Sequence, residues 1–349
     1  MDPFSQGALG AAAATTVAGA QRLRAFAVLG CIAGMVPDLD ILIGSSTDPL
    51  LFLEYHRQFT HALVFIPVGA GFVALALHWP VRHVLRPVET YLACAAGYAT
   101  HGLLDACTSY GTQLMWPFSD VRVAWNNVSV VDPLFTLPLI AFVIVAVVKR
   151  RRGFAAIGLA WAAGYLLLGV VQTQRVEAAG AAMAAVRGHE AERLTVKAGF
   201  GNLLVWKVIY ESGGRYYVDA VRAGLEIAVC PGASVPALAL RRDLPWLDAN
   251  SVQARDVERF RWFSDDYLAL DPANPARVID MRYSVVPNEI EPLWGIELDP
   301  KADPDQHAGF VATRRTSPDQ RDAYWGLLTG ADCPGTIKVR SPEKEGRFE

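Results

Sequence analysis

Long apolar stretches dominate the first half of the chain. Three of them, 62–79, 131–148 and 154–171, have about the 17 to 20 residues that a helix needs to cross a lipid bilayer. A fourth stretch, 90–107, is as long but contains His101 and Asp105. These stretches predict a helical membrane domain.

Two weaker apolar stretches come first, at 7–20 and 25–43. Pro37, Asp38 and Asp40 interrupt the second one. The start of the chain, MDPFSQG, lacks the basic residues of a secretory signal, so we expect it to remain as a weakly hydrophobic first helix. The sequence therefore predicts five or six membrane helices, the first two short or re-entrant.

The pattern changes after residue 171. Residues 172–189 are rich in alanine and predict a helix that leaves the membrane. Alternating segments follow, LTVKAG, NLLVWKVIY and RYYVDAVRAG, with ESGG as a hairpin turn between the last two. A helix at 252–263 and strands at 277–286 and 294–298 are expected further on. We therefore predict a multi-pass α-helical membrane domain, 1–172, a soluble α+β domain, 173–339, and a disordered tail, 340–349.

The composition supports a membrane protein, with 52% hydrophobic and 19% charged residues and a net charge of -3. Basic residues follow the first, third and fifth apolar stretches, at Arg22 and Arg24, at Arg82 and Arg86, and at 149–152. By the positive-inside rule these loops are cytoplasmic. The alternate loops and the soluble domain are then expected on the other side of the membrane.

The cysteines carry no metal-binding spacing. Cys31, Cys94 and Cys107 lie in apolar stretches and are expected to be buried. Cys230 and Cys333 lie in the polar half, where they can pair if that half is outside the cytoplasm. The sequence leaves this pairing open.

Three polar motifs fall on the predicted non-cytoplasmic side. His101 and Asp105 are four residues apart, so both project from one face of a helix and can share a metal ion. Asp38 and Asp40 point the same way if their segment is extended. In YHRQFTH, Thr60 is a candidate N-cap that would place His61 at the start of a helix and His56 in the loop before it.

Each motif has an ordinary structural interpretation when taken alone: a buried histidine and carboxylate pair, a helix stop, or a cap and loop. Together they bring three carboxylates and three imidazoles to one membrane face, which are the ligand types of a zinc-type hydrolytic site. The sequence therefore predicts a site for a divalent metal, zinc in the first place, as one or two ions. The candidate ligands are Asp38, Asp40, His56, His61, His101 and Asp105.

PDLD, HRQFTH and HGLLDACTSYG, followed by VDPLFTLPL, together resemble the YdjM-like family of membrane-bound metal-dependent hydrolases, also described as LexA-binding and inner-membrane-associated. The resemblance covers most of residues 1–148 and implies a multi-pass protein of the bacterial inner membrane. It carries over onto the six candidate ligands and onto Asp132. Members often begin with Asp, two residues and Thr-His, whereas this chain has Gln6 at the histidine position.

The His101 and Asp105 element also resembles that of the zinc-dependent phospholipase C and P1 nuclease group, which implies phosphoester cleavage. We therefore expect hydrolysis of a phosphoester or ester in a lipid-like substrate, at the periplasmic face. His56 is a candidate general acid or base as well as a ligand, and Arg57 is a candidate for holding a phosphate oxygen. Thr108, Tyr110, Asn126 and Asp132 are candidates for contacts that orient the ligands or the substrate.

Membrane lipids are the expected partners, with Trp116, Phe118 and Trp125 as interfacial anchors. A transporter or metal-handling protein, and a scaffold without catalytic activity, remain the alternatives. Nucleic acid is not an expected partner, because the charge balance is acidic and the site faces outward.

Overall fold

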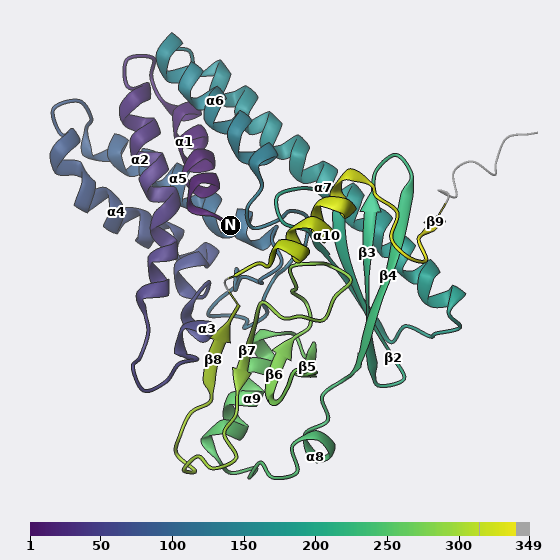
Figure 1. Cartoon of the computed structure of the whole chain (residues 1–349). Helices are drawn as coiled ribbons and strands as arrows, with labels where there is room; N and C mark the ends of the chain where they lie inside the picture. The colour runs from purple at the N-terminus through teal and green to yellow at the C-terminus, as the bar shows by residue number, and fades with distance from the viewer. Residues whose placement is uncertain (314, 340–349) are drawn as a thin grey trace, which may run out of the picture. The chain divides into compact units, whose positions relative to one another are not determined.

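The computed structural model describes residues 1–313 and 315–339, so the tail expected at 340–349 lies outside the described residues. The chain forms two compact units (Figure 1). The first consists of 1–43, 55–170 and 200–202. The second consists of 44–54, 171–199 and the chain from residue 203 onward. A sequence-based boundary at 172/173 misses the segment 44–54, which folds with the second unit.

The first unit is helical (Figure 1). Helices α1, α2 and α5 pack against one another, while α4 contacts α5 and α6 contacts α1. Helix α7 begins in this unit and continues into the second. The elements are α1 (Pro3–Val17), α2 (Leu23–Met35), η1 (Val36–Leu42), α3 (Leu51–Tyr55), η2 (Phe59–His61), η3 (Leu63–Phe65), α4 (Ile66–Val81), α5 (Pro87–Ala106), α6 (Pro133–Lys149) and α7 (Gly153–Val186).

Capping by side chains explains where two of these helices begin. The carboxylate of Asp2 accepts hydrogen bonds from the backbone of Phe4 and Ser5 at the start of α1. Asp132 does the same for Leu134 and Phe135 at the start of α6. In both helices proline follows the capping residue, where the missing N–H costs no hydrogen bond.

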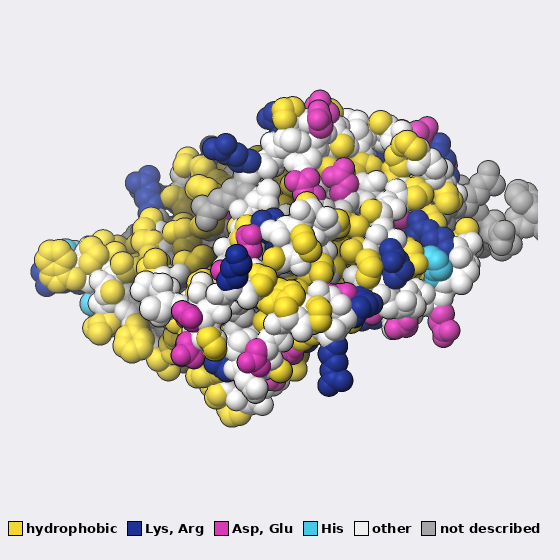
Figure 2. Space-filling view, turned by 60° about the horizontal axis from the view of Figure 1, so that its bottom comes forward, with side chains coloured by type: hydrophobic (Ala, Val, Ile, Leu, Met, Phe, Trp, Pro, Cys, Tyr) yellow, Lys and Arg dark blue, Asp and Glu magenta, His cyan; other side chains and the backbone are white. Residues whose placement is uncertain are grey.

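Within the described residues, three segments are long and apolar enough to span a membrane: Leu23–Leu42, Leu63–Val81 and Gly153–Val186; Pro133–Lys149 is a shorter apolar helix. Figure 2 shows hydrophobic side chains gathered on the surface of the helical unit. The membrane-helix content is thus confirmed, whereas the predicted count of five or six spans is not. The predicted membrane span 154–171 and the predicted helix 172–189 form one continuous helix, α7, because nothing in the sequence around residue 172 interrupts it.

Glycines allow α1, α2 and α5 to approach until their backbones touch. A Cβ atom added to Gly10 would lie 2.4 Å from the carbonyl oxygen of Gly30, and one added to Gly97 would lie 2.3 Å from the same oxygen. Gly30 and Gly34 form a GxxxG pair, which is typical of close helix packing in membranes. This contact brings the Gly34 carbonyl of α2 within reach of α5.

The second unit contains two antiparallel sheets with strand orders β1-β2-β3-β4-β9 and β5-β6-β7-β8. Their bounds are β1 (Arg193–Ala198), β2 (Val205–Ser212), β3 (Arg215–Ala223), β4 (Ile227–Pro236), β5 (Leu268–Asp271), β6 (Asn274–Asp280), β7 (Trp294–Glu297), β8 (Gly309–Ala312) and β9 (Ile337–Val339), with helices α8 (Leu240–Asp243), α9 (Val252–Phe263) and α10 (Pro318–Thr329).

Several expectations for this unit are confirmed. The turn ESGG joins β2 to β3, with Gly213 and Gly214 in the left-handed conformation that such a turn requires. The helix expected at 252–263 has those bounds. The strand expected at 277–286 was wrong in extent, because β6 ends at Asp280 and a loop follows. Cys230 and Cys333, whose pairing the sequence left open, form a disulfide bond.

Both faces of β2 are covered. The alternate residues Trp206, Val208 and Tyr210 are buried, and Gly180 of α7 packs against Val208. On the opposite face, Ile209 belongs to an apolar cluster with residues of β5 and β6, and Val205 belongs to a second cluster. The face of β2 that carries Val205 and Ile209 is therefore buried inside the second unit.

We predict that Gly97→Ala destabilises the protein, because the new methyl group collides with the Gly30 carbonyl of the neighbouring helix. Overpacking of this kind costs about 1–3 kcal/mol. Thermal unfolding in detergent, followed by tryptophan fluorescence, measures the effect. Gly71→Ala in α4 is the matched control, because a Cβ there meets no atom within 4 Å. Equal midpoints for the two variants would contradict the close packing.

Candidate metal centre

His101 and Asp105 lie at the end of α5, on the same face of the helix. Both side chains are fully buried. The Nδ1 atom of His101 lies 2.6 Å from the carbonyl oxygen of Gly34 and must donate to it, because a carbonyl oxygen only accepts. In the neutral ring, the Nε2 atom of His101 therefore presents a lone pair.

His61 is oriented in the same way. Its Nδ1 atom lies 3.2 Å from Oδ2 of Asp40 and 2.9 Å from the hydroxyl of Thr60. The Thr60 hydroxyl donates its own proton to Asp40 at 2.6 Å, so it accepts from His61. These partners assign the proton to Nδ1. The Nε2 atom of His61 then presents a lone pair as well.

Four ligand atoms converge at this point. The Nε2 atoms of His61 and His101 are 2.9 Å apart. Oδ1 of Asp38 lies 3.5 Å from the first and 3.4 Å from the second. Oδ2 of Asp105 lies 3.2 Å from Nε2 of His61. All four atoms lie within 4.8 Å of one another, each from a residue type that binds divalent metals.

The charges around this group bear on whether an ion fits it: Arg57 and the amino group of Met1 place positive charge at Asp105, and none of the four ligand atoms is itself a cation when both imidazoles are neutral. Two imidazole lone pairs and two carboxylate oxygens repel one another when they face a common centre. Oδ2 of Asp105 is buried and has no hydrogen-bond partner among the described residues, although the Nε atom of Arg57 lies 3.0 Å away outside hydrogen-bond geometry. An unsatisfied buried carboxylate oxygen fits a metal ligand. The donor set, two imidazoles and two carboxylates, fits one zinc-type ion.

Asp40 and His56 lie outside the four-atom group. Oδ1 of Asp40 contacts Nδ1 of His56 at 2.7 Å, and its Oδ2 accepts from the backbone of Arg57 at 3.0 Å. Asp40 thus orients His56 and His61 through their Nδ1 atoms. Carboxylates that hold metal-binding histidines in this way are common in metal sites.

Two local expectations were wrong. The segment with Asp38 and Asp40 is a 3₁₀ helix, η1, rather than extended, so these side chains two residues apart point in different directions. Only Asp38 reaches the ligand group. Thr60 does not cap a helix, because His61 ends the short turn η2 and α4 begins at Ile66. The Thr60 hydroxyl is used on Asp40 instead.

Arg57 is buried, with 4% of its surface exposed, and its backbone is in the left-handed region. Its Nη1 atom donates to the hydroxyl of Thr108 at 2.9 Å, and its guanidinium lies over the ring of Tyr110 at 5.0 Å. Thr108 and Tyr110 therefore hold Arg57 beside Asp105. An arginine that is merely solvated in a loop would not be enclosed in this way.

Asp132 and Asn126, two other candidates from the sequence, do not belong to the group of four ligand atoms. Asp132 caps α6 and accepts a hydrogen bond from the hydroxyl of Tyr165 at 2.8 Å. It joins α6 to α7 rather than contributing to the group of four ligand atoms. Asn126 takes a left-handed backbone conformation in the loop between α5 and α6.

Sequence reasoning missed the part that Gln6 plays. Its side chain is buried in α1, and Nε2 donates to Oδ1 of Asp105 at 2.8 Å. The amino group of Met1 also contacts that oxygen. The departure of Gln6 from the histidine that the family resemblance leads one to expect was the available signal. The position lies at the site, and here it holds a ligand through a hydrogen bond.

A second group of metal-binding residue types, Asp48, Asp256 and His307, lies within the second unit. Arg259 donates to both oxygens of Asp48 at 3.0 and 2.8 Å and to Asp256 at 2.8 Å. The guanidinium already supplies the positive charge that these carboxylates require. We therefore interpret this group as an ion-pair network that holds 44–54 against α9.

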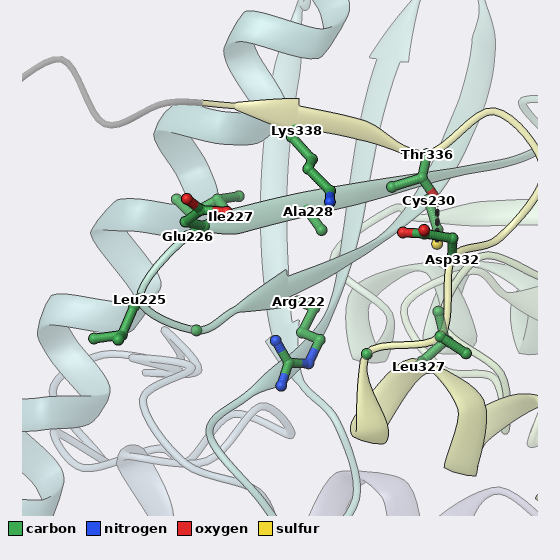
Figure 3. Close-up of a pocket in the computed structure, with 13 residues that line it drawn as sticks. Arg222, Leu225, Glu226, Ile227, Ala228, Cys230, Leu327, Asp332, Thr336 and Lys338 are labelled. Carbon is green, nitrogen blue, oxygen red and sulfur yellow. Dashed lines mark hydrogen bonds between the residues drawn. The ribbon is translucent and has the colours of Figure 1, made fainter.

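The second unit also has a cavity of about 520 Å³ beside β4 and β9 (Figure 3). Arg222 and Lys338 line it together with Glu226 and Asp332, so its charges balance. None of its lining residues belongs to the candidate metal centre.

Fold and site together define a helical membrane protein with a sheet-containing second domain and a largely buried group of side chains of the types that bind metals. The chain belongs to the YdjM inner membrane protein family, whose model matches residues 1–176, half of the 349 residues. All four converging ligand residues lie within the matched region. Neither a curated protein nor a solved structure matches the chain.

We predict that protein purified with zinc retains about one ion per chain, because the four ligand atoms form one group. His101→Ala removes a ligand and should abolish retention, whereas Asp40→Asn should weaken affinity about 10- to 100-fold by loosening His56 and His61. Elemental analysis and competition with a chelator measure both effects.

His78→Ala is the matched control, because His78 lies in the last turn of α4, contacts Thr90 in the first turn of α5 and is not among the four ligand residues. Unchanged zinc content in the His101→Ala protein would contradict the assignment of this site.

Proposed function

We propose that this protein is a membrane-bound metal-dependent hydrolase that cleaves a phosphoester or ester of a lipid-like substrate. The observation that carries the proposal is the convergence of two Nε2 lone pairs and two carboxylate oxygens, one of them a buried oxygen without a hydrogen-bond partner. Scaffolding alone gives no reason to bury His61, His101 and Asp105 side by side, because buried polar groups are expensive in a membrane domain.

Asp38, His61, His101 and Asp105 would hold the ion. A divalent ion at this place supplies Lewis acidity to the oxygen atoms of water and of the scissile ester. Asp40, Thr60 and Gly34 orient the two imidazoles, and Gln6 steadies Asp105. The residues around the ligands thus keep each ligand atom in position before substrate arrives.

His56 is suited to proton transfer. Asp40 contacts its Nδ1 atom, which leaves Nε2 to accept or donate a proton, and 24% of the side chain is exposed. An imidazole titrates near neutral pH and serves as general acid or base in many hydrolases.

Arg57 supplies a fixed positive charge beside Asp105. Thr108 and Tyr110 hold its guanidinium in place, so a phosphoryl oxygen would meet a donor that is already oriented. This supports a phosphoester over a carboxylic ester as the substrate.

The surroundings support a lipid-like substrate. The loop that follows Asp105 carries exposed aromatic side chains, with Phe118 79% and Trp125 48% exposed. Aromatic residues of this kind settle at membrane interfaces. Three segments of the chain have the length and hydropathy of membrane spans.

We further propose that the second unit faces the periplasm. Its disulfide between Cys230 and Cys333 is typical of an oxidising compartment. The basic residues at Arg82 and Arg86, and at 149–152, would then be cytoplasmic.

We predict that the zinc-loaded protein releases phosphate or a phosphorylated head group from phospholipid vesicles, measured by ³¹P NMR on phosphatidic acid, phosphatidylglycerol and phosphatidylethanolamine. His56→Gln should retain zinc and lower kcat about 10²- to 10⁴-fold, because it removes the group that transfers the proton. His83→Gln, at an exposed position of the loop after α4, is the control. Bound zinc without turnover on any of these lipids would instead favour a scaffold or transport role.

We predict that alkaline phosphatase fused after residue 189 is active, whereas a fusion after Arg86 is inactive, because the enzyme folds only outside the cytoplasm. Trapping of thiols in intact cells should also find Cys230 and Cys333 oxidised. An inactive fusion after residue 189, together with two free thiols, would overturn the proposed orientation.

A further inference from the structure

A lysine interrupts the apolar face of β2 in the second unit. Lys207 lies between Val205 and Ile209, which belong to two apolar clusters, and only 4% of its surface is exposed. Strand β2 has no other charged residue before Glu211, near its end. An apolar side chain would fill this position at lower cost, because burying an ammonium group requires several kcal/mol.

The amine of Lys207 reaches a serine. Its Nζ atom lies 2.7 Å from the hydroxyl oxygen of Ser284 and 2.9 Å from the carbonyl oxygen of Glu289. Ser284 belongs to the loop that follows β6 and is partly exposed. Its hydroxyl donates to the carbonyl oxygen of Val286 at 2.7 Å. The serine therefore lies between the buried amine and the surface.

No ion pair of Lys207 is formed within the described part of the chain. The neighbouring carboxylate, Asp280, is engaged by Arg282 through its Nε and Nη2 atoms at 2.9 and 2.7 Å. The other charged groups nearby are Glu289 and Lys197, which is the register partner of Lys207 on β1.

Burial lowers the pKa of Lys207 to about 7, against the opposing influence of Asp280 and Glu289. The neutral amine is therefore well populated near neutral pH, and it can accept a proton from a hydroxyl at hydrogen-bond distance.

We propose that Ser284 and Lys207 form a nucleophile and general-base pair, a second reactive site in the soluble domain that acts on an acyl ester or amide. Serine and lysine pairs of this kind occur on unrelated folds. The geometry matches the requirement that nucleophile and base lie within hydrogen-bond reach. The proposal does not depend on the metal centre.

The reaction balances with the groups present and water. The Ser284 hydroxyl turns from Val286 to Lys207, and its proton passes to Nζ as Oγ bonds to the substrate carbonyl carbon. The bond to the leaving alcohol or amine then breaks, and that group takes the proton from Nζ. Water attacks the acyl-serine and gives a proton to Nζ. Oγ of Ser284 leaves with that proton, which releases the acid.

The test uses the full-length protein in detergent and a fluorophosphonate probe, with mass spectrometry of the labelled peptide. We expect the label on Ser284, with a rate that rises as pH increases through about 7 and then levels off, because the base must be neutral. Lys207→Met, of similar length and apolar, should slow labelling about 10²- to 10⁴-fold. Ser284→Ala should abolish it, whereas Ser234→Ala, a serine on β4 that contacts Arg215, should not change it.

Two control measurements, one of folding and one on a metal-centre variant, separate the possible causes of a failed labelling. Thermal unfolding shows whether Lys207→Met remains folded; if it does not, the pH profile of the wild-type protein decides. His101→Ala should label at the wild-type rate, so failure of the metal centre and failure of this pair are separate results. Absence of label on Ser284 in folded protein between pH 6 and 9 would overturn the proposal. So would a pH-independent rate, or equal rates in the folded Lys207→Met protein.

Discussion

The candidate metal centre depends on the contact between the backbones of α2 and α5. Because neither Gly30 nor Gly97 has a side chain, the two helices approach closely enough for the Gly34 carbonyl to accept the Nδ1 proton of His101. That single hydrogen bond decides which nitrogen of His101 is left as a ligand. A bulkier interface would separate the helices and leave the imidazole without its orienting partner. Helix packing and ligand chemistry are therefore one constraint in this unit.

Side chains around the candidate ligands are also held in place by hydrogen bonds. The Asp40 carboxylate orients His61 and contacts His56. Thr108 and Tyr110 hold the Arg57 guanidinium. Each contact restricts a polar side chain that would otherwise choose among several rotamers. Such restriction has an entropic cost, and it is typical of sites where geometry matters more than stability.

Much of this arrangement can be predicted from the sequence, because hydropathy and loop charge predict that three motifs lie on one side of the membrane. Four of the six expected ligands meet in the structure, although a bound metal remains a prediction. What the sequence could not show depends on local geometry. The 3₁₀ turn that separates Asp38 from Asp40, and the use of the Thr60 hydroxyl on Asp40, arise from tertiary contacts that no periodicity reveals.

Two other features escaped for related reasons. Lys207 lies in a strand whose pattern is simply apolar, and its contact with Ser284 joins residues 77 positions apart. The sequence also did not show where α7 ends: the helix predicted at 172–189 ends at Val186.

The segment 44–54 makes the order of the sequence differ from the division of the chain into folded units. It lies inside the family-matched region, between Asp40 and His56, yet it folds with the second unit through Arg259, which binds Asp48 and Glu54. The second unit is therefore not built from the C-terminal half of the sequence alone. A chain that lost it would keep every candidate metal ligand and still lack the partner that holds the connection between two of its motifs.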